Sequence, residues 1–456
     1  MEDFKYSGSW WLPNTKRQVS GDLTFSSQEG IQLHLLDTIG EYSSTFEKIR
    51  DESSKEYPII LGMVTDCTLI TLCDCQEIGT NVCFKKIGAK ESLSYNTARY
   101  DAKAAFIGTH FFDLKELRFH RARVRYDYLP DFVRLQGFTN DFATRDGKFE
   151  RYTCTYELPP KIIANTSKGT ISASCSLNKN GEPIVKGLVL RQFTWLEIEL
   201  KEGLALKELD IRYVQPLQYL ISLATDKPNS VTGLFVYSKD RVETVPNNLS
   251  METPIQVVFQ QRERKERQDT LLSRSDLIFT LQDQGMSERF GGIIERWLNI
   301  THVDELGDVC NLFFSVLYAP DLNLVNQFLN IAFATELYHR KRFRDKSDFK
   351  DRIEEVVEAT SEVVSPLFSD RDYFVNKVKD TRHYRVHNAP DLKKKAAKDE
   401  ELYWMTKLLS YMVQTCLLKE LGLSSQECFE LFSKNRDYQF ALKRAPTWRK
   451  TKNSTG

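Results

Sequence analysis

The sequence predicts an α+β protein, with a β-rich N-terminal region folded as a sandwich or an open barrel and an all-α helical bundle behind it. Through residues 1–200, short apolar runs alternate with polar residues at a period of two, as in strands. From Gly285 onward the apolar residues recur at the spacing of a helix. Hydrophobic residues make up 41% of the chain and charged residues 28%, which excludes a wholly disordered protein.

The N-terminal strands are predicted from alternating segments that polar turns separate. These segments are 21–25, 31–36, 57–64, 67–75, 116–129, 169–177, 182–190 and 193–200. Asn180-Gly181 lies between two of them and is a strong signal for a hairpin. Many short strands joined in this way are typical of a sandwich or a barrel.

The pattern changes near Lys207, and with it the predicted domain. Residues 210–225 have helical spacing, whereas 226–240 are typical of a strand with turns. The charged segment 260–270 has few apolar residues and is expected to be a linker or an exposed helix. At ~150 residues per domain the length of the chain suggests two or three domains. We predict an N-terminal region at 1–245, a linker at 246–284 and a helical domain at 285–456.

Six helices are predicted in the C-terminal domain. They lie at 287–300, 325–343, 347–368, 371–390, 401–422 and 424–434. Pro366 and Pro390 limit the third and fourth helices, because proline cannot continue the hydrogen-bonded ladder. Gly422 closes the long amphipathic fifth helix. Helices of this number and length favour a bundle.

Charge and the N-terminal segment exclude several classes of protein. The chain has 63 Lys and Arg against 63 Asp and Glu, so a global basic field is excluded, although a local basic patch is not. No apolar run approaches the ~20 residues that a membrane helix needs. The first residues, MEDFKYSGSWWLP, lack the basic and apolar regions of a signal peptide. We therefore expect a protein that is not secreted and has no membrane partner.

The nine cysteines are expected to be reduced thiols rather than a disulfide framework. The densest group, Cys67, Cys73, Cys75 and Cys83, contains no C-x-x-C spacing. We interpret these residues as small buried hydrophobes, with a zinc site as the alternative. The chain also has no phosphate-binding loop and no zinc-protease or serine-hydrolase motif. We expect no metal and no cofactor.

One helix places a charged residue inside an apolar stripe. At 100° per residue, Arg382 falls in the middle of a stripe formed by Phe374, Val375, Val378 and Val386. A buried lone guanidinium is costly, so Arg382 must be paired or functional, unless its head reaches solvent. His387 lies about 140° further round, at the helix end.

Local charge around this helix is strongly basic. Residues 371–398 hold nine Lys and Arg against three acids, a net +6, and residues 340–352 hold seven against three, a net +4. Tyr338, Phe343, Tyr373 and Tyr384 interleave with these cations. Such segments are typical of a surface that binds phosphates and bases. The alternative is that the charged residues only face solvent and the aromatic residues belong to the core.

These residues resemble a known family. The sequence R-H-Y-R-V-H at 382–387 is similar to the R-x4-H signature of HEPN-domain ribonucleases, with His383 in place of the usual polar residue after the arginine. The segment F-L-N-I-A-F-A-T-E-L-Y-H-R-K resembles the family's second motif, whose acidic residue falls on Glu336. The segments G-S-W-W-L-P-N, V-S-G-D-L-T-F and F-T-W-L-E-I-E-L resemble the N-terminal domain of ApeA-type proteins. The resemblance covers essentially the whole chain.

The resemblance implies a bacterial, cytoplasmic RNase that is normally restrained and acts in anti-phage abortive infection after a phage-derived trigger. HEPN enzymes are metal-independent and usually dimeric, with two R-x4-H motifs facing each other. We therefore expect a homodimer through the helical domain. RNA is the expected substrate, with tRNA as one candidate, and the N-terminal region is expected to sense or restrain.

The resemblance also implies roles for individual residues. His387 would be the general acid/base and Arg382 the clamp on the phosphate, while Glu336 would orient Arg382. His383 would position the RNA or the other histidine. The expected products are a 2′,3′-cyclic phosphate and a 5′-OH. Further RNA contacts are expected from Tyr384, Arg385, Lys393, Lys394 and Lys395.

A simpler interpretation exists for each residue. Arg382 could be structural, His387 a cation at a helix C-terminus, and His383 a bystander. Glu336 could be an ordinary helix acid, and the three lysines a solvated loop. For the whole chain, the alternative function is a non-catalytic protein that binds nucleic acid or only dimerises.

Overall fold

The computed structural model describes residues 1, 3–39, 55–87, 91–113, 117–179, 188–239, 242–245, 249–260, 270–319, 321–343 and 347–445. The predicted hairpin at Asn180-Gly181 and most of the charged segment 260–270 lie outside these residues. The chain forms two compact units whose segments alternate along the sequence. Unit 1 comprises Met1–Asp127, Trp195–Leu209 and Ser230–Gln268, and unit 2 comprises Tyr128–Thr194, Asp210–Asn229 and Asp269–Gly456.

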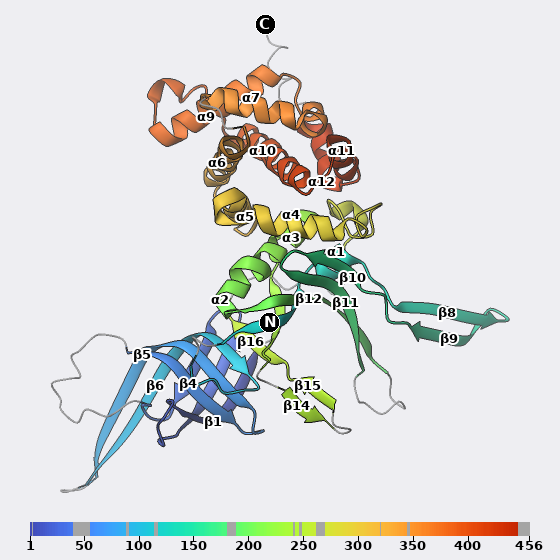
Figure 1. The fold of residues 1–456 in the computed structure, drawn as a ribbon. Helices are drawn as coiled ribbons and strands as arrows, with labels where there is room; N and C mark the ends of the chain where they lie inside the picture. Colours follow the sequence, from blue (N-terminus) through green and yellow to red (C-terminus); the bar gives the residue numbers. More distant parts are fainter. Residues whose placement is uncertain are drawn as a thin grey trace. The chain divides into compact units, whose positions relative to one another are not determined.

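Unit 1 contains a closed six-stranded antiparallel barrel (Figure 1). Its strands run in the order β6-β3-β2-β1-β4-β5, and β5 pairs back with β6 to close the ring. The strands are β1 (Phe4–Trp11), β2 (Val19–Ser26), β3 (Gly30–Leu35), β4 (Glu56–Val64), β5 (Leu69–Ile87) and β6 (Glu91–Ile107). The β-rich N-terminal region is therefore confirmed, and the barrel is the form that it takes.

The alternation seen in the sequence builds the barrel core. Leu23, Leu33 and Leu72 are at most 1% exposed, and on β3 the neighbours of Leu33, Gln32 and His34, are more exposed than Leu33 itself. Cys73 and Cys75 are buried on β5 as predicted, whereas the prediction is wrong for Cys67, which is exposed. The side chain of Cys83 is outside the described part of the chain. Burial raises the pKa of the Cys73 thiol to about 12. Within the described residues, no group of three or more histidines, cysteines and acids is placed to hold a metal ion.

Further strands of unit 1 extend the barrel wall beyond β6. The order continues β6-β16-β13-β7-β12. These strands are β7 (Phe119–Tyr126), β12 (Leu190–Leu204, assigned to unit 1 from Trp195), β13 (Val231–Tyr237) and β16 (Ile255–Phe259). Unit 1 also has a separate pair, β14 (Val242–Val245) and β15 (Leu249–Glu252), and the short helix α2 (Leu206–Leu209). The strands β15 and β16 thus fall inside the segment 246–284, whose role as a linker stays a prediction.

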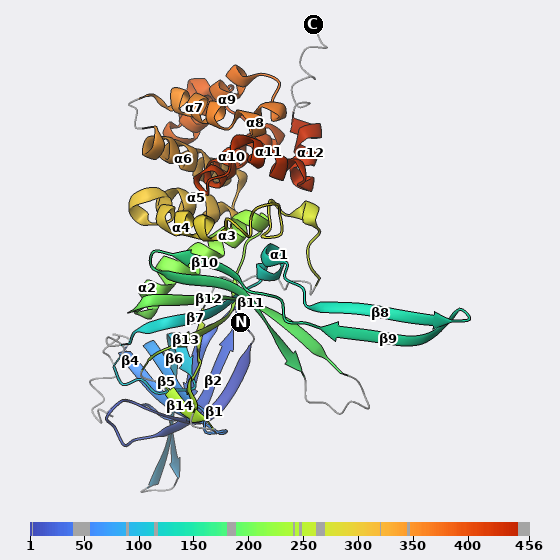
Figure 2. The same ribbon diagram turned by 45° about the vertical axis from the view of Figure 1, so that its right-hand side comes forward.

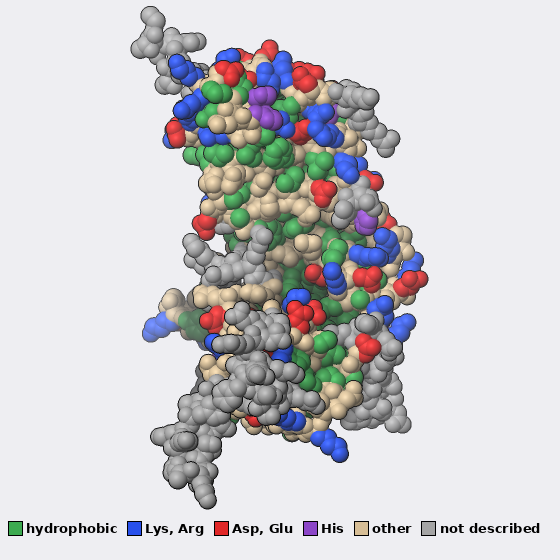
Figure 3. All heavy atoms as spheres, turned by 90° about the vertical axis from the view of Figure 1, so that its left-hand side faces the viewer, with side chains coloured by type: hydrophobic (Ala, Val, Ile, Leu, Met, Phe, Trp, Pro, Cys, Tyr) green, Lys and Arg blue, Asp and Glu red, His purple; other side chains and the backbone are tan. Residues whose placement is uncertain are grey.

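Unit 2 is dominated by a helical bundle, as the sequence predicts (Figure 2). Its helices are α4 (Phe290–Ile300), α5 (Asp308–Leu317), α6 (Leu324–Arg342), α7 (Phe349–Ala359), α8 (Ser361–Val364), α9 (Arg371–His387), α10 (Asp399–Glu420), α11 (Ser425–Ser433) and α12 (Arg436–Arg444), with a π-helical turn at Val303–Gly307 and 3-10 turns at Arg274–Asp276, Ser365–Leu367 and Pro390–Leu392. Charged side chains of both signs are interspersed over the surface in Figure 3. None of the described helices has the length and apolarity to cross a bilayer.

The helix predicted at 347–368 is divided. Thr360 lies between α7 and α8 with φ −119°, outside helical geometry, and its hydroxyl donates to the carbonyl oxygen of Val356 at 2.7 Å. A threonine bonded back to its own helix competes with the backbone ladder. This break turns the chain between α7 and α8.

The remaining elements of unit 2 come from earlier in the sequence. They are α1 (Leu129–Val133), the hairpin of β8 (Phe138–Arg145) and β9 (Lys148–Tyr156), the pair β10 (Ile162–Thr166) and β11 (Gly169–Lys179), a π-helical turn at Asp210–Val214 and α3 (Gln215–Thr225). The predicted helix at 210–225 is therefore present, with its first turn π-helical.

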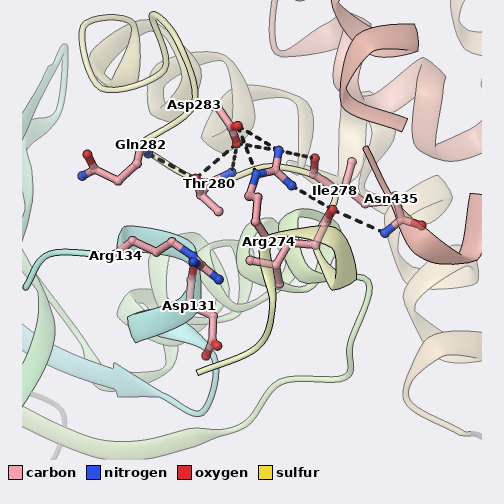
Figure 4. A network of polar contacts seen from close by, with 9 residues as sticks. Asp131, Arg134, Arg274, Ile278, Thr280, Gln282, Asp283 and Asn435 are labelled. Atoms are coloured by element: carbon pink, nitrogen blue, oxygen red, sulfur yellow. Dashed lines mark hydrogen bonds and ion pairs between the residues drawn. The ribbon is translucent and has the colours of Figure 1, made fainter. Parts of the chain in front are cut away.

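Residues 270–285, here called the strap, tie these elements to the last helix (Figure 4). Arg274 grips both carboxylate oxygens of Asp283 at 2.8 Å and donates to the carbonyl of Leu277 at 3.0 Å. The backbone N–H of Ile278 donates to Ala224 at the end of α3, and Asn435 beside α12 donates to Leu277. The apolar side chains of the strap at 277–279 and 281 are at most 1% exposed, so this part of the predicted linker is packed inside unit 2.

Candidate functional site

Helix α9 carries the R-x4-H residues and is fixed at both ends. Asp370 caps its start by accepting from the N–H of Tyr373, and Asn388 ends it in a left-handed conformation with φ 50°. Phe374, Val375 and Val378 are buried as predicted.

The predicted apolar stripe is wrong at its last member. Val386 is 41% exposed, while Thr381 is fully buried. The buried stripe thus ends at Thr381, because Val386 lies in the last helical turn, directly before the chain leaves the helix at Asn388.

Arg382 lies at the edge of this stripe and meets an acid from α6. Its Nη2 donates to Oε2 of Glu336 at 3.3 Å, and its side chain is 21% exposed. The guanidinium also lies 4.8 Å from the ring centroid of Phe349 and 5.6 Å from that of Phe333. The structure therefore brings together Arg382 and Glu336, the two residues that the sequence motifs single out.

Glu336 binds two further arginines, which sequence reasoning did not identify. Its Oε1 accepts from Nη2 of Arg340 and from Nη1 of Arg352, each at 2.6 Å. We call Arg340, Arg352 and Arg382 with Glu336 the arginine cluster. The net +4 of residues 340–352 pointed to this region, but nothing in the spacing marked Arg352, which reaches Glu336 from another helix, α7.

His383 and His387 lie side by side on the outer side of α9. Their ring centroids are 4.8 Å apart with an interplanar angle of 51°, and both residues are exposed. Figure 3 shows histidine side chains at the surface among Lys and Arg, at the level of α7 and α9. No hydrogen bond joins either imidazole to Arg382 in the described part of the chain. Within one protomer, Arg382 faces α6 and α7 while the histidines face solvent.

The expected RNA-contacting residues surround this helix end. Tyr384 and Arg385 are half-buried, and the Arg385 guanidinium lies 5.3 Å from the Tyr384 ring centroid. The backbone N–H of Ala397 donates to the Thr381 hydroxyl at 2.8 Å, which holds the loop before α10 against α9. Lys393, Lys394 and Lys395 are exposed on that loop.

Helix α6 carries half-buried apolar side chains beside the cluster. Val325, Leu329, Phe333 and Leu337 follow one another at intervals of four along the helix. Phe333 also contacts Arg382. Figure 3 shows hydrophobic side chains gathered at this level, below the histidine-bearing end. An apolar face therefore continues directly into the charged site.

A buried histidine supports the same helix from inside. His339 is fully buried, stacks on Phe343 with ring centroids 4.7 Å apart, and bonds Glu355 of α7 at 2.9 Å. This contact joins α6 to α7 one turn after Glu336, and sequence reasoning missed it. A histidine in such a position has a packing role rather than access to substrate.

Two family models match the chain. One, described as ApeA N-terminal domain 1, matches residues 5–297, and the other, described as Apea-like HEPN, matches residues 318–427. The second match contains Glu336, Arg352, Arg382 and His387. No curated protein and no solved structure matches the chain. The resemblance drawn from the sequence is confirmed.

Proposed function

This chain belongs to the ApeA family, whose N-terminal domain spans more than half of it, and on this basis we propose that it is a metal-independent endoribonuclease of anti-phage abortive infection. An ApeA N-terminal domain followed by a HEPN domain fits an anti-phage defence protein with a nuclease domain. HEPN domains generally act on RNA and commonly dimerise. One observation supports the proposal most: helix α9 carries both Arg382, which lies in a cluster with excess positive charge, and two exposed imidazoles, those of His383 and His387.

In the proposed reaction, the 2′-OH of the RNA attacks the adjacent phosphate. Negative charge then grows on the phosphorane oxygens, and Arg382 stabilises it with paired N–H donors. The products are a 2′,3′-cyclic phosphate and a 5′-OH. An acid, a base and a cation from side chains suffice for this chemistry, so the proposal requires no metal.

His387 is proposed as the general acid/base. An imidazole takes or gives a proton near neutral pH. The reaction needs such a group to remove the proton of the 2′-OH or to protonate the leaving 5′ oxygen. His383, 4.8 Å away, would position the RNA or the other ring. Tyr384, Arg385 and Lys393–Lys395 would contact bases and phosphates further along the strand.

The active site is proposed to form between two copies of the chain. Arg382 faces α6 and α7 while His387 faces solvent, so one copy does not bring the pair together. A twofold axis beside α9 would place Arg382 of one copy opposite His387 of the other. The apolar side of α6 next to the cluster offers surface for such a contact.

The N-terminal region is proposed to restrain this activity until a phage-derived component is present. The barrel carries no catalytic constellation among its described residues, and an RNase that cuts the host's RNA must be inactive in uninfected cells. Cytoplasmic location and tRNA as substrate belong to the same proposal.

Sequencing of RNA ends from bacteria expressing the protein, with and without phage, tests the proposal. New 5′-OH ends should appear on infection and vanish in Arg382→Ala and in His387→Ala. Lys379→Ala removes an exposed cation from the same helix and should leave them in place. Ends that persist in both variants would contradict the proposal, and RNA binding without cleavage would favour the non-catalytic alternative.

A further inference from the structure

The arginine cluster holds more positive charge than its acid can neutralise. Three guanidiniums share one carboxylate, so the four residues carry a net charge of +2. Glu336 is 7% exposed and the side chains of Arg352 and Arg382 are 14% and 21% exposed. Uncompensated charge at such partly buried positions is costly unless an anion completes the site.

The two carboxylate oxygens of Glu336 are used unequally. Oε1 receives both 2.6 Å contacts, from Arg340 and Arg352, whereas Arg382 reaches Oε2 at 3.3 Å. A bond of 2.6 Å is at the short end for a charge-assisted pair, and 3.3 Å is beyond its usual range. The carboxylate of Glu336 thus binds Arg340 and Arg352 closely and Arg382 only weakly.

A cluster without Arg352 would behave differently. An isolated pair of Glu336 and Arg382 is neutral, and a neutral pair attracts a phosphate poorly. Arg340 is on the same helix as Glu336 and is 56% exposed, so solvent screens its contribution. Arg352 comes from α7 and is the least exposed of the three, so its charge is the one that solvent screens least.

We propose that Arg352 is a positioning residue for the phosphate clamp. It occupies and neutralises Glu336, so that the guanidinium of Arg382 keeps its charge available to an RNA phosphodiester. This inference rests on the proposed function, because it assigns the ligand of the cluster as the phosphate of the RNA substrate. Arg352 acts through Glu336 and touches no substrate.

The test compares Arg352→Gln with Arg371→Gln in the full-length protein purified from phage-infected cells. Arg371 joins α9 to α7 by pairing with Glu358, whereas Arg352 joins α7 to α6 by pairing with Glu336. Each change removes one positive charge from a contact between α7 and a neighbouring helix. Binding of a single-stranded RNA oligonucleotide is measured against salt, and kcat and KM are measured with the same RNA.

Arg352→Gln should weaken RNA binding about tenfold at low salt and reduce the slope of log K against log salt by about one. Arg371→Gln should change affinity by less than about threefold. Arg352→Lys keeps the charge and should restore most of the affinity. If Arg352→Gln does not fold, a folded Arg352→Lys that loses affinity tenfold overturns the inference, because charge alone then does not explain the role.

The double variant with Glu336→Gln separates positioning from support of the fold. Once the carboxylate is gone, Arg352 has nothing to neutralise, so adding Arg352→Gln should cost little further affinity. Equal losses in both backgrounds would overturn the inference. If wild type cleaves RNA while Arg352→Gln behaves like Arg371→Gln, only the inference fails. If wild type neither binds nor cleaves RNA, the proposed function fails with it.

Discussion

At the scale of single residues, the site is organised by one buried carboxylate. The sequence placed Arg382 in an apolar stripe and Glu336 in a second motif, and the structure joins them at 3.3 Å. Arg352 could not be predicted, because its contact with Glu336 depends on how α7 packs against α6. Spacing along one helix contains no information about that packing.

Replacing Glu336 by glutamine should destabilise the helical unit by about 2–4 kcal/mol, because it leaves partly buried guanidiniums without their counter-charge. Chemical denaturation of the full-length protein measures this free energy of unfolding. Glu358→Gln is the matched control, since Glu358 pairs with Arg371 but is 68% exposed, and it should cost less than about 1 kcal/mol. Equal costs would show that Glu336 is not the organising residue.

The buried thiols of the helical unit predict alkaline instability. Burial raises the pKa of Cys310, Cys416 and Cys428 from 9.0 to about 12. Above pH 9 the unfolded chain ionises these thiols while the folded chain does not. Each protonated thiol therefore makes its full contribution to the free energy of unfolding below pH 9. That contribution falls as the pH rises toward 12, by at most about 1.4 kcal/mol per pH unit for each thiol.

Denaturation between pH 8.5 and pH 11 measures that slope. A variant with alanine at all three positions should start less stable, because of lost packing, but its stability should fall less steeply with pH. Replacing the exposed Cys67 should leave the slope unchanged. A slope that is the same in the triple variant and in wild type would contradict this account.

At the scale of elements, helices with a strong apolar period were predicted well. Helices α4, α6, α9, α10 and α11 lie where the sequence expects them. The failures have local causes. Thr360 divides the helix predicted at 347–368, and α5 and α12 were not predicted at all. The burial of the strap was also not predicted, because packing against distant elements leaves no periodic signal in so short a segment.

Arg274→Ala should destabilise unit 2 by about 2–4 kcal/mol. The change removes the guanidinium that binds both carboxylate oxygens of Asp283 and that donates to the carbonyl oxygens of Leu277 and Ile278. Arg436→Ala removes an arginine that pairs with Asp276 of the same strap but is 68% exposed, and should cost less than about 1 kcal/mol. Urea denaturation compares the two. A larger effect of Arg436→Ala would contradict the role given to the strap.

At the scale of the whole molecule, composition and periodicity predicted the order of a β-rich region and a helical bundle. They did not predict the interleaving of the two units, because a unit built from three separate segments is defined by contacts between distant residues. Closure of the barrel also depends on the long pairing of β5 with β6. The polar sequence of β6, E-S-L-S-Y-N-T-A-R-Y-D, alternates too weakly to indicate a strand.

A site shared between two copies makes a prediction about mixtures. Chains with Arg382→Ala and chains with His387→Ala should each be inactive, and a mixed dimer should recover part of the activity, because one of its two sites keeps both groups. Cleavage of RNA by co-expressed chains measures the recovery. Mixtures as inactive as either variant alone would place both groups in one protomer.

The proposed chemistry is tested most sharply by analysing the RNA ends that the protein, purified from phage-infected cells, produces in excess EDTA. We expect cleavage to 2′,3′-cyclic phosphate and 5′-OH ends, reduced at least about 100-fold in Arg382→Ala and in His387→Ala. Cleavage that requires added Mg²⁺ and survives both substitutions would contradict the proposed chemistry.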